Sequence, residues 1–304
     1  MGDPSMSCSP AVPAAAYTEA GRGQTVLLLH GSTGNGTMWR STMDALRPAF
    51  RCIAPDLIGY GRSQAWPPDV PFHLNAETQA LKELLPCCGG KFHLAGYSYG
   101  GAVALHLALA NPGRVLSLTL IEPVVFAALR YTGEDGAHGN LQSECDRFAV
   151  TLADGEREAA MEQFINFWNG SGAWARLRPA VRDSVVGMAG KAVLDWKASF
   201  AADPGPDRLA ALGPLTLLVR GDGSPEPVQC LVDALHALMP ESERAVVQGA
   251  NHLLPLTHSA ELTGLINTRL LASTEGSCCA RPRQKVLARF RAGTKTENCS
   301  RQCC

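Results

Sequence analysis

The sequence lacks three features, each of which would point to a different class of protein. No charge of one sign dominates, because 27 Lys and Arg residues face 28 Asp and Glu residues, for a formal net charge of -1 over 304 residues. No apolar run reaches the roughly 18 residues that span a bilayer. The body of the chain does not interleave aromatic with basic residues. We therefore expect no nucleic-acid partner and no membrane insertion.

The N-terminus and the cysteines also carry few of the usual signals. The start of the chain, residues 1–4, lacks the charged and apolar blocks of a signal peptide. We therefore expect a cytoplasmic protein. Thiols stay reduced in that compartment, so the 11 cysteines predict no disulfide framework. No Cys-x-x-Cys pair occurs, and adjacent cysteines fit tetrahedral zinc poorly. We expect neither a metal nor a cofactor.

What the chain does contain is a series of short apolar runs separated by helix-length segments. Such runs are typical of buried parallel strands, and their alternation with helices predicts an α/β fold with a doubly wound, mostly parallel sheet. The carboxyl ends of the strands then meet at one edge, where open α/β sheets bind ligands. The predicted strands are residues 25–30, 51–55, 91–95, 116–121, 215–219 and 245–247.

One long interruption divides the predicted core. Residues 123–213 carry helical patterns, so we predict a helical lid inserted into a core made of residues 1–122 and 214–272. The aromatic side chains of the lid either pack it onto the sheet or line a substrate pocket. The basic, cysteine-containing residues 273–304 have few apolar side chains to bury, and we expect them to be disordered. Residues 1–16 are rich in Ala, Pro and Ser. We therefore expect the first, antiparallel strand of the sheet to be missing or very short.

The segment Gly96-Tyr97-Ser98-Tyr99-Gly100 lies where a predicted strand turns into an apolar helix. A sharp turn at this point needs glycine on either side of the serine, and it lifts the Ser98 hydroxyl out of the sheet. The same turn puts the N–H of Tyr99 at a helix start, where it faces an oxyanion formed by attack on a carbonyl. Ser98 is therefore a candidate nucleophile.

Other segments combine with this turn into a family resemblance. His30-Gly31-Ser32-Thr33-Gly34 and residues 55–63 each follow a predicted strand, and Gly249-Ala250-Asn251-His252 follows the last one. Over residues 16–271 the chain resembles the α/β-hydrolase fold family, in its serine esterase-like branch. The resemblance implies a catalytic pair of Ser98 and His252, with the backbone N–H groups of Ser32 and Tyr99 as an oxyanion hole. It also implies that the histidine at position 30 shapes its turn and transfers no proton.

The acid that would orient His252 is open between two residues. Members of the family commonly carry it three residues after the glycine that ends the penultimate strand, and Ser224 occupies that position here. A recognised variant places the acid after the preceding strand, where this chain has Glu122. We favour Glu122 over Asp222, which directly follows the glycine. The structural alternatives are that Asp222 caps a turn and that Glu122 pairs with an arginine.

These residues predict a serine hydrolase that cleaves a small or medium carboxylic ester through an acyl-enzyme. By resemblance, dehalogenases and epoxide hydrolases of this fold carry aspartate where this chain has Ser98. Carbon–carbon hydrolysis of diketone acids, lactone opening and perhydrolysis use the same residues and stay open. An arginine such as Arg130, Arg176 or Arg178 on an acid substrate would favour the carbon–carbon class. A non-catalytic small-molecule receptor is the alternative from another class, because Ser224 replaces the usual acid.

Overall fold

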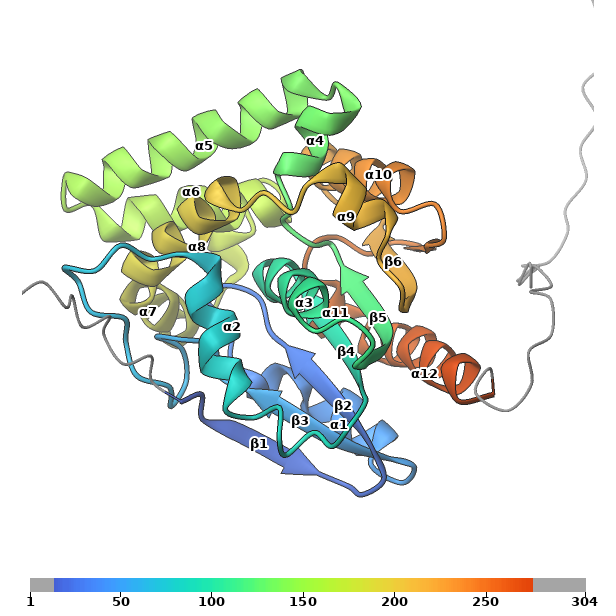
Figure 1. Ribbon diagram of the computed structural model, residues 1–304. Helices are drawn as coiled ribbons and strands as arrows, with labels where there is room; N and C mark the ends of the chain where they lie inside the picture. The colour runs from blue at the N-terminus through green and yellow to red at the C-terminus, as the bar shows by residue number, and fades with distance from the viewer. Residues whose placement is uncertain (1–13, 276–304) are drawn as a thin grey trace, which may run out of the picture.

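The computed structural model describes residues 14–275, and its backbone alternates strands and helices along the chain (Figure 1). The strands are β1 Tyr17–Ala20, β2 Gln24–Leu29, β3 Phe50–Pro55, β4 Phe92–Tyr97, β5 Val115–Ile121, β6 Leu215–Gly221 and β7 Glu243–Val247. The helices are α1 Arg40–Leu46, α2 Leu74–Lys82, α3 Tyr99–Ala110, α4 Ala127–Thr132, α5 Asp135–Ala153, α6 Arg157–Asn169, α7 Pro179–Gly187, α8 Ala189–Ala201, α9 Pro206–Ala210, α10 Glu226–Leu238, α11 Leu254–Thr257 and α12 Ser259–Glu275. Two short 3-10 helices are η1 Gly36–Trp39 and η2 Trp174–Arg176.

The strands form one sheet in the order β1-β3-β2-β4-β5-β6-β7. The edge strand β1 pairs antiparallel with β3, whereas the other pairings are parallel. The predicted α/β fold with a doubly wound, mostly parallel sheet is confirmed. The short antiparallel strand β1, of four residues, occupies the place where the sequence predicts a missing or very short strand.

Strand β2 shows how the sheet separates two hydrophobic cores. Successive side chains of a strand point to opposite faces, and accordingly Leu27 and Leu29 belong to one buried cluster while Val26 and Leu28 belong to the other. The first core packs against α2, α3 and α10, and the second packs against α1 and α12. Because both faces of the central strands are covered, their sequences are continuous apolar runs rather than alternating patterns.

Helices α4 to α9 lie between β5 and β6 in the chain, and we call them the helical insert. In Figure 1 the insert gathers above the sheet, at the end where β2 and β5 finish. None of the helices within residues 14–275 combines the length and apolar character needed to cross a bilayer. Helix α12 runs on to Glu275, past the expected end of the core at residue 272. The rest of the predicted tail lies outside the described residues.

Candidate active site

Ser98 lies in the turn between β4 and α3 with φ 53° and ψ -119°. A positive φ is uncommon for a residue with a side chain and marks backbone strain held by the surrounding structure. The turn has no space for a side chain at Gly100, because a Cβ atom there would lie 2.2 Å from the carbonyl oxygen of His30. A Cβ atom at Gly96 would lie 2.2 Å from the carbonyl oxygen of Gly100. The glycines on both sides of Ser98 are thus required by close backbone approach.

Ser98, His252 and Glu122 converge from three loops at the carboxyl ends of the strands. The Nε2 atom of His252 lies 3.1 Å from Ser98 Oγ, and its Nδ1 atom lies 2.6 Å from Glu122 Oε2. All three side chains are buried, with residue exposures of 8%, 5% and 1% for the serine, the histidine and the glutamate. A carboxylate that accepts from Nδ1 leaves Nε2 as the acceptor for the serine proton.

Glu122 reaches the imidazole from the residue that follows β5. Its backbone has φ 45°, which makes it, with Thr33 and Ser98, one of the three non-glycine residues with positive φ in the described part of the chain. Its Oε1 atom accepts hydrogen bonds from the N–H of Gly221 at 2.7 Å and from Ser224 Oγ at 2.5 Å. The serine at the usual acid position therefore donates to a carboxylate that enters the same space from the neighbouring strand.

The other candidate acid, Asp222, is exposed. Its Oδ1 atom accepts a hydrogen bond from the backbone N–H of Gly249 at 2.7 Å, and its own N–H donates to the carbonyl of Val247 at 3.2 Å. These bonds tie the end of β6 to the loop that leads to His252. The structure brings Glu122, and not Asp222, to the imidazole.

Two aromatic residues fix the position of His252. The hydroxyl of Tyr97 donates to the backbone carbonyl of His252 at 2.6 Å. The indole of Trp168 stacks on the imidazole with ring centroids 5.0 Å apart and an angle of 28° between the planes. The sequence gives no separate signal for either contact, because Tyr97 reads as part of the turn around Ser98 and Trp168 as lid packing or pocket lining.

The two residues predicted to supply oxyanion N–H groups both lie beside Ser98. A Cβ atom at Gly31 would lie 3.1 Å from the Cβ atom of Ser98, so the backbone just before Ser32 passes the serine at contact distance. Tyr99 is the first residue of α3, where an N–H has no acceptor within its own helix. Both residues line the same cavity as Ser98.

His30 holds the loop that carries Ser32. Its Nε2 atom accepts a hydrogen bond from the backbone N–H of Leu57 at 2.9 Å, so Nδ1 carries the proton and donates to the carbonyl of Gly31 at 2.8 Å. Burial lowers the pKa of His30 to about 4, which keeps the imidazole neutral. The ring shapes the turn after β2 through both of its nitrogen atoms.

The cavity beside Ser98 has a mostly apolar lining, as small-molecule sites usually do. Its lining residues are Ser32, Ser98, Tyr99, Val124, Phe126, Phe164, Trp168, Ala192, Asp195, Trp196 and Ser199. Asp195 is the unexpected member of this set. It is 2% exposed, yet its spacing of four residues from Lys191 is the spacing of a solvated surface pair on a helix, so the sequence gives no sign of it. Within residues 14–275, no cluster of three or more His, Cys, Asp or Glu residues could hold a metal ion.

Comparison with known proteins places this chain in a family. The profile of the alpha/beta hydrolase fold matches residues 24–259. A pimeloyl-(acyl-carrier protein) methyl ester esterase of Methylococcus capsulatus is 29% identical over 272 residues, which cover 84% of this chain and 97% of that protein. The structure of a thermophilic esterase from Thermogutta terrifontis, with malate bound, matches with a TM-score of 0.65 at 24% identity, and covers 85% of this chain and 93% of that one.

Two further relatives match over shorter segments. The lipase LipV of Mycobacterium tuberculosis is 43% identical over 101 residues, which are 33% of this chain and 37% of the lipase. A haloalkane dehalogenase of Mesorhizobium japonicum is 40% identical over 108 residues, which are 35% of this chain and 34% of the dehalogenase. The matched part of this chain thus spans about a third of each of these two relatives. Because the profile match spans most of the sequence, the protein belongs to the α/β-hydrolase fold family.

Proposed function

We propose that this protein is a serine hydrolase that cleaves small or medium carboxylic esters through an acyl-enzyme. The observation that carries the proposal is the connected set of Ser98 Oγ, the His252 imidazole and the Glu122 carboxylate, with separations of 3.1 Å and 2.6 Å. A serine hydroxyl is a poor nucleophile until a base takes its proton, and a histidine oriented by a carboxylate supplies that base.

The chemistry then follows in two halves. Ser98 Oγ attacks the ester carbonyl carbon while His252 Nε2 takes the hydroxyl proton, and the carbonyl π electrons move onto the oxygen. The N–H groups of Ser32 and Tyr99 hold this oxyanion, and Glu122 stabilises the imidazolium. Collapse expels the alcohol, which receives the proton from His252. Water activated by the same histidine hydrolyses the acyl-enzyme, which releases the carboxylic acid and restores Ser98.

The position of the helical insert favours an ester substrate of limited size. Phe164, Trp168 and Trp196 of the insert line the cavity together with Ser98, so we propose that residues 123–213 form a lid over the site. Together with Tyr99 and Phe126, these bulky side chains form the wall of the space beside Ser98. A short acyl group fits this space better than a long one.

The arginine contacts favour ester hydrolysis over carbon–carbon hydrolysis of acid substrates. Arg130 pairs with Asp203 at 3.2 Å, and Arg176 donates to the carbonyl of Ser171 at 3.4 Å. Neither of them, nor Arg178, is among the residues that line the cavity. The nearly full-length match to a methyl ester esterase supports the same choice. Among the shorter matches, the serine at position 98 favours esterase chemistry over that of the dehalogenase.

The receptor alternative rested on the serine at position 224. The carboxylate that this position lacks is supplied by Glu122, which contacts both His252 and Ser224. A pure binding protein has no need for a nucleophile, a base and an acid in hydrogen-bonded order. The contacts therefore favour an enzyme over a receptor.

Hydrolysis of a p-nitrophenyl ester series by the wild type and Ser98→Ala tests the proposal. We expect Ser98→Ala to lower kcat by about a thousandfold or more, because the nucleophile is removed. Ser41→Ala, at an exposed position on α1, is the matched control and should retain wild-type kcat. Turnover by Ser98→Ala equal to that of the wild type would exclude the acyl-enzyme route for these esters.

A further inference from the structure

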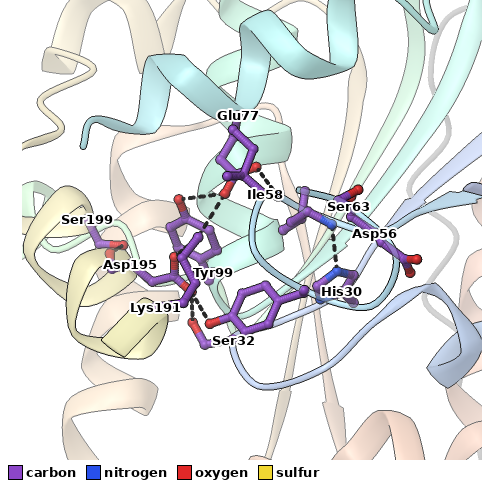
Figure 2. Close-up of polar contacts among 12 residues, drawn as sticks. His30, Ser32, Asp56, Ile58, Ser63, Glu77, Tyr99, Lys191, Asp195 and Ser199 are labelled. Carbon is purple, nitrogen blue, oxygen red and sulfur yellow. Dashed lines mark hydrogen bonds and ion pairs between the residues drawn. The ribbon is translucent and has the colours of Figure 1, made fainter. Parts of the chain in front are cut away.

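A second set of charged side chains lies against the site, and the triad chemistry does not use it. Glu77 of α2 and Lys191 and Asp195 of α8 form this set, which we call the buried ionic cluster (Figure 2). The Nζ atom of Lys191 contacts Glu77 Oε1 at 2.9 Å and also contacts Asp195 Oδ1. The two carboxylate residues are 0% and 2% exposed. Two carboxyl groups thus share one ammonium group away from water.

Such a cluster is costly for stability alone. Each ion that leaves water costs several kcal/mol, and apolar side chains of similar volume often pack at least as well. Burial raises the pKa of both Glu77 and Asp195. For Lys191, burial alone lowers the pKa, but the facing carboxylates of Asp195 and Glu77 more than offset this and raise it, so the ammonium group stays charged. Buried ionisable groups with shifted pKa values beside a reaction centre point to a role in function.

The hydrogen bonds of Asp195 lead to the loop after β2. Its Oδ2 atom accepts from Ser32 Oγ at 2.7 Å and from the hydroxyl of Tyr60 at 2.6 Å. Figure 2 shows Asp195 next to both Lys191 and Ser32. A helix of the insert is therefore bonded directly to the side chain of Ser32, whose N–H is one of the two oxyanion donors in the proposed function.

The hydrogen bonds of Glu77 lead to the turn that carries Ser98. Its Oε1 atom accepts from the hydroxyl of Tyr99 at 3.4 Å, and its Oε2 atom accepts from the backbone N–H of Ile58 at 3.0 Å. The Lys191 ammonium also lies 4.9 Å from the centre of the Tyr99 ring, within the range of a cation–π contact. Both residues proposed as oxyanion donors therefore have side chains bonded to the same buried cluster.

We propose that Asp195, with its charge balanced by Lys191, is a positioning residue for the oxyanion hole. This inference rests on the proposed serine hydrolase function. An oxyanion donor must lie about 2.7–3.1 Å from the developing charge, so small displacements of the Ser32 backbone weaken it. The hydrogen bond from Ser32 Oγ to Asp195 fixes that loop from the insert side. The ammonium group of Lys191 offsets the negative charge that Asp195 would otherwise direct at the oxyanion.

Asp195→Asn, Ser32→Ala and the double variant test the inference on the full-length protein. Asp195→Asn preserves side-chain volume and leaves Lys191 paired with Glu77. We expect each single variant to lower kcat for p-nitrophenyl butyrate about tenfold or more, with KM changed by less than about twofold. Because Asp195 acts through the Ser32 hydroxyl, the double variant should lose less than about twofold beyond Ser32→Ala. Asp183→Asn, an exposed carboxylate on α7, is the matched control with wild-type kcat.

A purely structural role makes a different prediction, and a transition-state analogue separates the two. A trifluoromethyl ketone adds to Ser98 as a hemiketal whose oxygen occupies the oxyanion position. Its inhibition constant should rise in Asp195→Asn by the same factor by which kcat falls. Melting temperatures identify any variant that fails to fold. Ser32→Ala removes a single hydroxyl, so it keeps the test available if Asp195→Asn unfolds.

Two results would overturn the inference. One is wild-type kcat and inhibitor affinity in folded Asp195→Asn and Ser32→Ala; the other is losses that multiply fully in the double variant, because independent effects are additive in free energy. Ser98→Ala distinguishes this failure from that of the proposed function. If Ser98→Ala retains wild-type turnover, the proposed function fails and the inference fails with it. If Ser98→Ala is inactive while Asp195→Asn is fully active, only the inference fails.

Discussion

The Nδ1 atom of His252 lies 2.6 Å from the Oε2 atom of Glu122, a residue 130 positions earlier in the chain. The carboxylate is buried and has two further hydrogen-bond donors on its other oxygen, the N–H of Gly221 and the hydroxyl of Ser224. A carboxylate held in this way fixes both the tautomer and the orientation of the imidazole.

The first prediction concerns the choice between the two candidate acids. Glu122→Gln should lower kcat by about a thousandfold or more, because an amide cannot stabilise the imidazolium and favours the wrong tautomer. Asp222→Asn should keep kcat within about threefold, because Asp222 contacts the N–H of Gly249 rather than the imidazole. Steady-state hydrolysis of p-nitrophenyl butyrate by both variants decides the matter. A larger loss in Asp222→Asn than in Glu122→Gln would reverse the assignment.

The second prediction concerns the loop that presents His252. Tyr97→Phe removes the donor to the His252 carbonyl and leaves that buried acceptor unpaired, which should cost about 1–3 kcal/mol of unfolding free energy. We expect kcat to fall less than about tenfold, because the triad itself is intact. Tyr17→Phe, on the exposed edge strand β1, is the control. Equal urea midpoints for wild type and Tyr97→Phe would contradict the prediction.

Much of the fold and the elbow could be predicted from local pattern. The strands are buried on both faces, so their sequences are continuous apolar runs that stand out from the helices. Ser98 could be located because its turn needs flanking glycines, and Glu122 became a candidate because it directly follows a predicted strand. Both signals lie within a few residues of the chain, at the end of a predicted strand.

The parts of the site that could not be predicted depend on contacts across the chain. Asp195 pairs with Lys191 four residues away, which is also the pattern of an exposed helix, and only the packing of α8 against α2 and the loop after β2 buries the pair. The bond from Ser224 to Glu122 joins residues 102 positions apart. No periodicity or motif within a single segment predicts a contact between residues so far apart in the sequence.

The third prediction concerns the space at the elbow. Gly100→Ala should destabilise the protein by about 2 kcal/mol or more, because its Cβ atom would meet the His30 carbonyl at 2.2 Å and backbone cannot move aside cheaply. Gly136→Ala in α5 has open space around its Cβ position and should be neutral or stabilising by up to about 1 kcal/mol. Thermal unfolding of the two variants should show shifts of opposite sign or clearly different size. A small effect at Gly100 would mean that the turn can relax.

The fourth prediction concerns the stability of the protein at acidic pH. Burial lowers the pKa of both His30 and His93 from 6.5 to about 4, so each is neutral in the folded protein at pH values where the unfolded chain is already protonated. The unfolded state then binds more protons, and the free energy of unfolding falls as pH drops from about 6.5 to about 4, by up to about 3 kcal/mol for each residue. Urea unfolding at several pH values measures the slope. Stability that is flat across this range would contradict the prediction.

The last prediction concerns the size of the acyl group. Phe164 lines the cavity beside Ser98 and is only half-buried, so Phe164→Ala enlarges the space at a moderate cost in stability. The wild type should prefer p-nitrophenyl butyrate over the octanoate, and Phe164→Ala should raise the octanoate-to-butyrate ratio of kcat/KM about tenfold, which is within the range for added methylene groups in an apolar pocket. Phe167→Ala, on the same helix but outside this cavity, should leave the ratio unchanged. An equal shift in both variants would mean that the insert as a whole had loosened, and that the wall formed by Phe164 does not set the chain length.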